Sequence, residues 1–160
     1  MPRITALIHT ANDAPRLGRA LETLFPCAEI LIVDHSSADS SRRIAREYGA
    51  RILWAENGAP MQHYLGHANY DWIFCLHPSE SITEALQASL LEWSSLPGTS
   101  IYAKAFCMFV REQMEGTWQR HSEPQTRLVP RDWNLWKGWL PAHEGSSTTL
   151  EGELLRIAFP

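Results

Sequence analysis

The chain has 160 residues, of which 44% are hydrophobic and 20% charged, and its formal net charge is -4 with a pI near 6.0. This length predicts a single domain, residues 1–160, with a core of its own, and the composition is typical of a soluble globular protein. The lack of a Lys/Arg-rich patch argues against a nucleic-acid partner, and no apolar run approaches the ~20 residues of a membrane span.

The cysteines and the N-terminus indicate the compartment. Cys27, Cys75 and Cys107 have no metal-ligand spacing, and the last two lie inside apolar runs. This pattern favours buried thiols in a reducing compartment over disulfides. The first ten residues, MPRITALIHT, are too short and too polar for a signal peptide. We therefore expect a cytoplasmic protein.

Strands and helices alternate through the first part of the sequence. Short apolar runs predict strands, and apolar residues at helical spacing predict the helices between them. The first helix begins after Asn12 or Asp13 and stops at Pro26, and Gly49 closes the second. The expected strands are residues 4–8, 29–33, 51–54 and 72–76, and the second and third helices are 40–48 and 62–68. This alternation predicts the α/β class, with a doubly wound, mostly parallel sheet flanked by helices.

The pattern changes towards the C-terminus. The expected elements are a helix at 83–93, strands at 101–110, 126–129 and 150–157, and an irregular segment at 113–122. Three tryptophans fall three residues apart, at positions 133, 136 and 139. This part is richer in strands and aromatic residues. We therefore expect two halves within one domain, a nucleotide-binding half at 1–97 and an acceptor-side half at 98–160.

The stretch ILIVDHSSAD, residues 30–39, has the clearest functional pattern. An apolar run bounded by turn residues is typical of a strand buried in a parallel sheet, with Asp34 at its carboxyl end. Ligands of open α/β sheets bind at that edge, where Thr10 and Asn12 are also expected. Ser36, Ser37 and Asp39 also offer caps for the next helix, so a well-capped helix without a ligand is the alternative interpretation.

Three stretches of the first 93 residues, ITALIHTAND, AEILIVDHSSADSSRRIAREYGARIL and DWIFCLHPSESIT, resemble inverting glycosyltransferases of family 2 with the GT-A fold. The nearest resemblance is to bacterial glucosyltransferases that decorate the lipopolysaccharide inner core. It implies transfer of a sugar from a nucleotide-diphosphate donor to a hydroxyl of a carbohydrate acceptor. It also implies that the nucleotide is bound by Thr10, Asn12, Asp34 and Asp39.

Two segments of the second half resemble the same family. QTRLVPR matches a Gln-x-Arg-Leu segment, which implies that Arg127 meets the diphosphate; a strand residue paired with a carboxylate is the alternative. Glu123 holds the position of a family Asp, which implies a general base for the acceptor hydroxyl. WKGWLPAHEG matches a Trp-x-Gly…His-Glu segment and implies a functional role for His143 and Glu144.

The main departure from the family lies after the fourth strand. Family members carry an Asp-x-Asp there, whose carboxylates hold a divalent metal beside the leaving diphosphate. This chain has His77-Pro78-Ser79-Glu80 instead. Met61 and Gln62 stand where the family has a basic residue and an Asn, and Tyr70 replaces a Gly.

Two interpretations follow from this departure. In the first, His77 and Glu80, together with His143, still hold Mn²⁺ or Mg²⁺, since His also suits Mn and Zn. In the second, the chain is a non-catalytic relative that acts as a nucleotide- or sugar-binding or scaffold protein. A phosphoacceptor role for Asp34, as in receiver domains, is disfavoured because the acidic pair and the late-strand lysine of that site have only poor counterparts in Asn12-Asp13 and Lys104.

Overall fold

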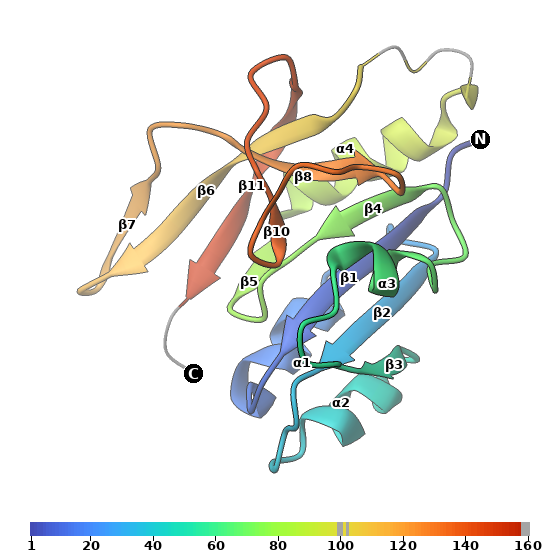
Figure 1. Cartoon of the computed structure of the whole chain (residues 1–160). Helices are drawn as coiled ribbons and strands as arrows, with labels where there is room; N and C mark the ends of the chain where they lie inside the picture. Colours follow the sequence, from blue (N-terminus) through green and yellow to red (C-terminus); the bar gives the residue numbers. More distant parts are fainter. Residues whose placement is uncertain (99–100, 102, 158–160) are drawn as a thin grey trace.

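The computed structural model describes residues 1–98, 101 and 103–157. Within them a nine-stranded sheet runs in the order β3-β2-β1-β4-β8-β6-β11-β5, with β7 paired to β6 (Figure 1). Its strands are β1 (Ile4–Thr10), β2 (Glu29–Asp34), β3 (Arg51–Trp54), β4 (Trp72–Cys75), β5 (Glu80–Ile82), β6 (Phe106–Met114), β7 (Thr117–Arg120), β8 (Gln125–Pro130) and β11 (Thr148–Ile157). The helices are α1 (Ala14–Glu22), α2 (Ser41–Glu47), α3 (Met61–Leu65) and α4 (Glu84–Ser95), and β9 (Trp136–Lys137) and β10 (Leu140–Pro141) form a separate hairpin.

The first four strands form a parallel sheet, which confirms the predicted fold class. β1 pairs in parallel with β2 and β4, and β2 with β3, so the carboxyl ends of all four strands meet at one edge. β1 is buried at every position because both of its faces are covered. No helix in the described part of the chain is long and apolar enough to cross a membrane.

Two apolar cores lie on opposite faces of this sheet, because successive side chains of a strand point to opposite sides. Ile4, Ala6 and Ile8 of β1 pack in the core that includes α1 and α4, whereas Leu7 packs in the core that includes α3. Figure 1 shows α3 in front of the sheet and α1 behind it. Apolar side chains therefore cover both faces of the sheet.

Two strands, β5 and β7, were not predicted from the sequence. Residues 113–122 were expected to be irregular, which is wrong: β6 continues to Met114 and returns as β7 through a turn at Glu115 and Gly116, both with positive φ. The side chains of β7 are all exposed, so this hairpin lacks the apolar alternation by which strands are recognised. β5 was missed because its three residues are a strand only through pairing with β11. The strand expected at 101–110 begins at Phe106, and residue 102 lies outside the described residues.

A buried ion pair connects distant strands of the sheet. The guanidinium of Arg127 on β8 donates to both carboxylate oxygens of Glu80 on β5, at 2.6 and 2.9 Å. Both side chains are almost fully inaccessible to solvent. Arg156 on β11 donates to the same carboxylate at 2.9 Å. Burial by itself raises the pKa of the Glu80 carboxyl, but Arg127 and then Arg156 outweigh it and lower the pKa to about 2.

Replacement of this carboxylate, Glu80→Gln, should destabilise the protein by about 3 to 5 kcal/mol, because it leaves the Arg127 charge buried without a counter-ion. The wild type should also lose stability as pH falls from about 4.5 towards 2, since a lowered pKa in the folded state favours folding only above the unfolded-state value. The variant should lack that part of the pH dependence. Urea unfolding at several pH values measures both effects.

The matched control is Asp71→Asn, which removes the carboxylate from an exposed ion pair with Arg131. This variant should unfold like the wild type at each pH, because solvent screens exposed pairs. Equal losses of stability in the two variants would contradict the importance assigned to the Glu80 pair.

A glycine allows the last strand to approach α4. Gly152 has φ +98° at an irregularity in the pairing of β11 with β6. A Cβ there would overlap the backbone of Leu86 and lie 2.7 Å from its Cβ. The neighbouring Glu153 N–H donates to the hydroxyl of Thr83, which also caps α4 by accepting from the Leu86 N–H. β11 and the N-terminus of α4 are therefore in direct backbone contact.

The variant Gly152→Ala should lose at least about 3 kcal/mol of stability, from steric overlap and the left-handed backbone together. Gly116→Ala is the control, because Gly116 also has positive φ, +81°, but a Cβ at that position would meet no other atom within 4 Å. The control should cost about 1 to 2 kcal/mol. Chemical denaturation of both variants measures the difference, and equal losses would show that contact with Leu86 is unimportant.

Candidate functional site

The loops after β1 and β2 are joined through Asn12. Its main chain is left-handed, with φ 56°, and its N–H donates to the hydroxyl of Ser37 at 3.0 Å. Its side-chain oxygen accepts from the N–H groups of Ala38 and Asp39, at 2.7 and 3.3 Å. Asp39 in turn accepts from the N–H of Ala14. The two loops therefore form one hydrogen-bonded unit at the carboxyl edge.

The other two expected nucleotide ligands lie inside this unit. The buried carboxylate of Asp34 accepts from the N–H and the hydroxyl of Ser37, and Arg42 lies 3.4 Å away. The hydroxyl of Thr10 donates to Asp13 at 2.9 Å. The structure thus brings together Thr10, Asn12, Asp34 and Asp39, as expected for one edge of the sheet. Their polar groups hold the loops, and only Asn12 and Asp39 are exposed.

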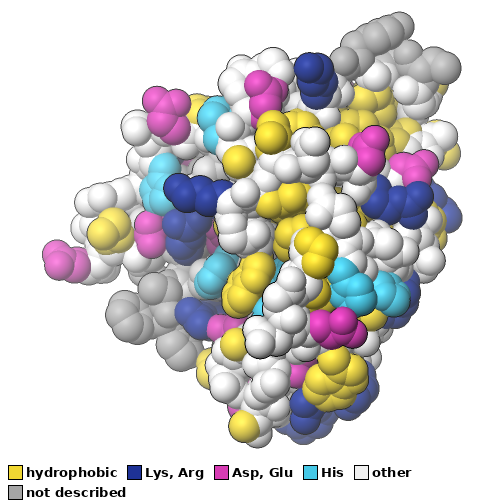
Figure 2. Space-filling view, viewed as in Figure 1, with side chains coloured by type: hydrophobic (Ala, Val, Ile, Leu, Met, Phe, Trp, Pro, Cys, Tyr) yellow, Lys and Arg dark blue, Asp and Glu magenta, His cyan; other side chains and the backbone are white. Residues whose placement is uncertain are grey.

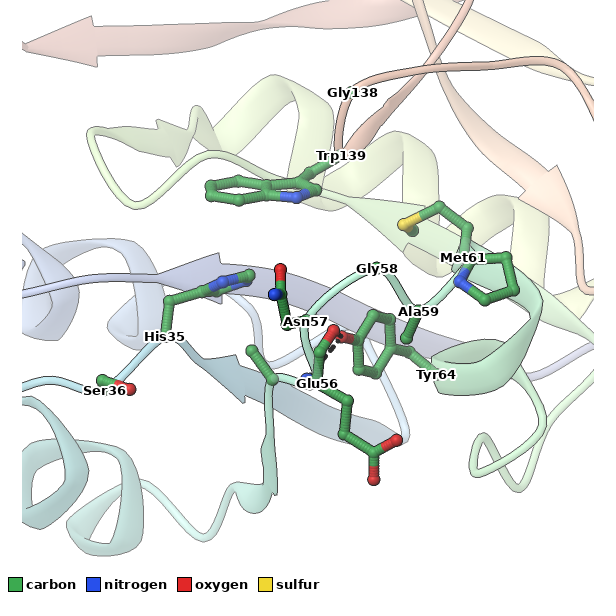
Figure 3. A pocket seen from close by; sticks show the side chains of 12 residues that line it. His35, Ser36, Glu56, Asn57, Gly58, Ala59, Met61, Tyr64, Gly138 and Trp139 are labelled. Atoms are coloured by element: carbon green, nitrogen blue, oxygen red, sulfur yellow. Dashed lines mark hydrogen bonds between the residues drawn. The ribbon is translucent and has the colours of Figure 1, made fainter.

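A pocket of about 600 Å³ opens beside these loops. It lies between the ends of β2 and β3, the segment leading into α3, and the turn of the β9–β10 hairpin. In Figure 3 the indole of Trp139 lies above His35 and across the pocket from Tyr64 and Glu56. The lining residues are His35, Ser36, Ala55, Glu56, Asn57, Gly58, Ala59, Pro60, Met61, Tyr64, Gly138 and Trp139.

Trp139 and His35, which line the pocket, belong to a cluster of aromatic rings that also contains His9. The Trp139 ring stacks on His9 with centroids 5.0 Å apart and lies 4.3 Å from that of His35. His9 Nδ1 and His35 Nε2 are 2.9 Å apart and share a hydrogen bond. Burial, followed by the proximity of His35, lowers the pKa of His9 to about 3, and burial also lowers the pKa of His35. Both rings are therefore neutral at pH 7.

Sequence reasoning missed His9, His35 and Trp139 as parts of the site. A signal was present for the two histidines, since each is adjacent in sequence to an expected ligand, Thr10 or Asp34. Trp139 reaches them from the second half of the chain, which no local pattern indicates. Figure 2 shows the face of the molecule seen in Figure 1, with histidine side chains around hydrophobic side chains near its middle.

The β4–β5 turn forms a second part of the same edge. His77 Nδ1 lies 3.1 Å from the N–H nitrogen of Ser79 and 2.7 Å from its hydroxyl. The His77 N–H donates to Glu80 at 2.8 Å. These hydrogen bonds hold the imidazole in one orientation. The pKa of His77 is lowered, mainly by burial. The neighbouring carboxylates of Glu80 and Asp13 oppose this shift, and Arg156 and Arg16 add to it.

The residues present do not fit a divalent metal. The described residues contain no group of three or more His, Cys, Asp or Glu side chains that could hold one, so His77, Glu80 and His143 do not form such a group. Both oxygens of Glu80 are bound by arginines. His143 Nδ1 instead lies 3.1 Å from the hydroxyl of Thr126. Neither carboxylate oxygen of Glu80 is therefore available to a metal ion.

Arg127 and Glu123 differ sharply in accessibility. Arg127 is fully buried, and its guanidinium donates to Glu80, Gln125 and the carbonyl of Cys75, so it faces the interior of the sheet. Glu123 is exposed in the segment before β8. Because β8 runs antiparallel to β4, it begins near the carboxyl end of β4. Glu123 therefore precedes β8 on the side of the sheet where the pocket opens.

Comparison with known protein sequences finds relatives named glycosyltransferase over about half of the chain. No protein-family profile matches the chain. An uncharacterized glycosyltransferase of Rickettsia felis is 30% identical over 95 residues, covering 54% of this chain and 32% of the relative. The lipopolysaccharide core biosynthesis glycosyltransferase LpsC of Rhizobium meliloti is 29% identical over 97 residues, covering 56% and 36%. The chain therefore spans about a third of the length of these relatives.

Solved structures match a larger share of the chain, 69%. Staphylococcus aureus TarS superposes with a TM-score of 0.56 at 14% identity, covering 69% of this chain and 36% of TarS. Glucosyl-3-phosphoglycerate synthase of Mycobacterium tuberculosis, solved with Mn²⁺, UDP and glucosyl-3-phosphoglycerate, gives a TM-score of 0.50 at 14% identity, covering 69% and 44%. The sequence similarity relates about half of this chain to bacterial proteins named glycosyltransferase, and the solved structures show that the chain has the GT-A fold.

Proposed function

We propose that the chain binds a nucleoside-diphosphate sugar and transfers the sugar to a hydroxyl of a carbohydrate acceptor. The observation that carries the proposal is the pocket at the carboxyl edge of β2 and β3, which is the ligand-binding edge of an open α/β sheet. Sequence similarity to proteins named glycosyltransferase falls within about half of this chain. The mycobacterial neighbour with UDP adds support for a nucleotide ligand.

The nucleotide base would lie in the pocket against Trp139. An indole offers a flat surface on which a base stacks, and the Asn57 side chain and His35 supply polar groups nearby. Thr10, Asn12, Asp34 and Asp39 would act mainly by holding the two loops that border this position. Because Trp139 belongs to the second half, the expected halves 1–97 and 98–160 would both contribute to nucleotide binding.

Glu123 would be the general base. Deprotonation of an acceptor hydroxyl needs a carboxylate within hydrogen-bond reach, and this exposed glutamate precedes β8 at the pocket side of the sheet. Arg127, although expected at the diphosphate, would serve the site indirectly by holding Glu80 and thus the β4–β5 turn.

Nucleotide binding is tested by isothermal titration of UDP and GDP into the wild type and Trp139→Ala. The variant should bind at least about tenfold more weakly, because base–aromatic stacking is worth ~1–3 kcal/mol. Trp118→Ala is the control, since Trp118 is another half-exposed tryptophan, on β7. Failure of the wild type to bind any nucleoside diphosphate would refute the proposed ligand.

Catalysis is tested with Glu123→Gln. Turnover of a nucleotide-sugar should fall by about 10² to 10⁴, the usual contribution of a general base, while UDP affinity stays that of the wild type. Glu115→Gln, at the exposed β6–β7 turn, should leave turnover unchanged. The readout is release of nucleoside diphosphate from a panel of donors; full activity of Glu123→Gln would remove this residue from the mechanism.

A second candidate is a binding or scaffold protein without catalysis. It is favoured by one observation: the carboxylate at the end of the β4–β5 turn, Glu80, is bound by two arginines rather than exposed. This candidate predicts UDP binding without donor turnover, with or without Mn²⁺ or Mg²⁺. Turnover of any donor by the wild type would exclude it.

A further inference from the structure

We propose that the β4–β5 turn is a metal-independent site for a phosphoryl oxygen, in which the Nε2–H group of neutral His77 is the hydrogen-bond donor. The inference rests on the proposed function for the identity of the ligand, a nucleoside diphosphate. The bound group would be a phosphoryl oxygen, held by a protein N–H at the position where the resemblance implies a metal ion. The donor character of His77 follows from the geometry of the turn alone.

The proton of His77 is located by its neighbours. The backbone N–H of Ser79 can only donate, and its nitrogen lies 3.1 Å from His77 Nδ1. Nδ1 must therefore carry a lone pair, which also accepts from the Ser79 hydroxyl at 2.7 Å. A neutral imidazole has one N–H, so its proton is on Nε2. Ser79 is buried, which keeps these contacts from exchanging with solvent.

The turn that carries His77 is rigid. The His77 N–H donates to Glu80 at 2.8 Å, and the Glu80 N–H donates back to the His77 carbonyl at 2.9 Å. Pro78 restricts the backbone between them. The carboxylate of Glu80 is held in turn by Arg127 and Arg156. The Nε2–H donor is therefore preorganised before a ligand arrives.

The same geometry makes His77 a poor metal ligand. A histidine that binds a metal through Nε2 carries its proton on Nδ1 and donates it to a carbonyl or carboxylate. Here Nδ1 faces the N–H of Ser79, so a proton on Nδ1 would point at another donor. Coordination through Nε2 would therefore cost the hydrogen bond from the Ser79 N–H, although the Ser79 hydroxyl could still accept from Nδ1. The turn therefore suits an electron-rich oxygen, which accepts from N–H groups, and not a cation.

The surroundings of His77 also suit an anionic oxygen. Arg16 at the start of α1 and Arg156 on β11 both lie within electrostatic range of the ring, together with the carboxylates of Asp13 and Glu80. Each carboxylate is paired with an arginine, Asp13 with Arg16 and Glu80 with Arg156. An added phosphoryl oxygen would therefore not meet an uncompensated carboxylate from these neighbours.

The first experiment measures the tautomer in the wild type. Long-range ¹H–¹⁵N correlation spectra of the histidine rings, with the His77 signals assigned from His77→Gln, should show a protonated Nε2 and an unprotonated Nδ1 at pH 7. Addition of UDP or inorganic pyrophosphate in EDTA should shift the Nε2–H signal. A proton on Nδ1, or no shift with either probe, would overturn the inference.

The second experiment measures affinity. Isothermal titration of UDP in EDTA and in Mn²⁺ should give dissociation constants within about twofold. His77→Phe should weaken binding at least about tenfold, because it removes a hydrogen bond to a charged group. His77→Gln, whose amide nitrogen can occupy the Nε2 position, should stay within about threefold, and His67→Phe in the exposed turn after α3 should match the wild type.

The outcomes separate the two proposals. UDP binding that requires Mn²⁺ would overturn this inference and leave the proposed function standing. A pyrophosphate shift at His77 without UDP binding would support the anion site and refute the nucleotide. Equal affinities of His77→Phe and the wild type would overturn the inference even if both bind UDP. Thermal unfolding of each variant distinguishes lost contacts from lost folding.

Discussion

The buried ion pairs of the Glu80 carboxylate with Arg127 and Arg156 are the interaction on which the second half of the sheet depends most. This carboxylate connects the β4–β5 turn to β8 and β11, strands that follow much later in the sequence. A buried charge is tolerated only when its partners are close and its hydrogen bonds are complete. Here the two arginines and the N–H of His77 complete them. One side chain therefore links β5 and the turn before it to β8 and β11.

This interaction also determines what the edge of the sheet can bind. A carboxylate bound by two guanidinium groups has no oxygen available for a cation, and the turn that it holds presents His77 with a lone pair directed at Ser79. The contacts that stabilise the fold therefore leave the β4–β5 turn with no free carboxylate for a metal ion, and they direct the Nε2–H of His77 outward as a hydrogen-bond donor. Stability and ligand chemistry are coupled at this turn.

The pocket also depends on contacts between residues that are far apart in the sequence. His9 and His35 stay neutral because they are buried beside each other, and Trp139 covers them. A neutral aromatic wall suits a flat heterocycle better than a charged group, which agrees with the proposed position of a nucleotide base. The diphosphate would then extend from the pocket towards the β4–β5 turn. Two chemically different surfaces of one sheet edge would bind the two parts of a nucleotide.

The sequence by itself determined the four parallel strands, their helices and the edge at which Thr10, Asn12 and Asp34 meet, because apolar runs, caps and turn residues are local signals. Its pattern did not reveal the β6–β7 hairpin, whose exposed side chains lack apolar alternation. Only the tertiary structure decided the partners of polar side chains: Arg127 reaches Glu80, 47 residues away, and is buried. Hydrogen-bond partners depend on how strands are ordered in space, and that order is set by packing of the whole sheet rather than by neighbouring residues.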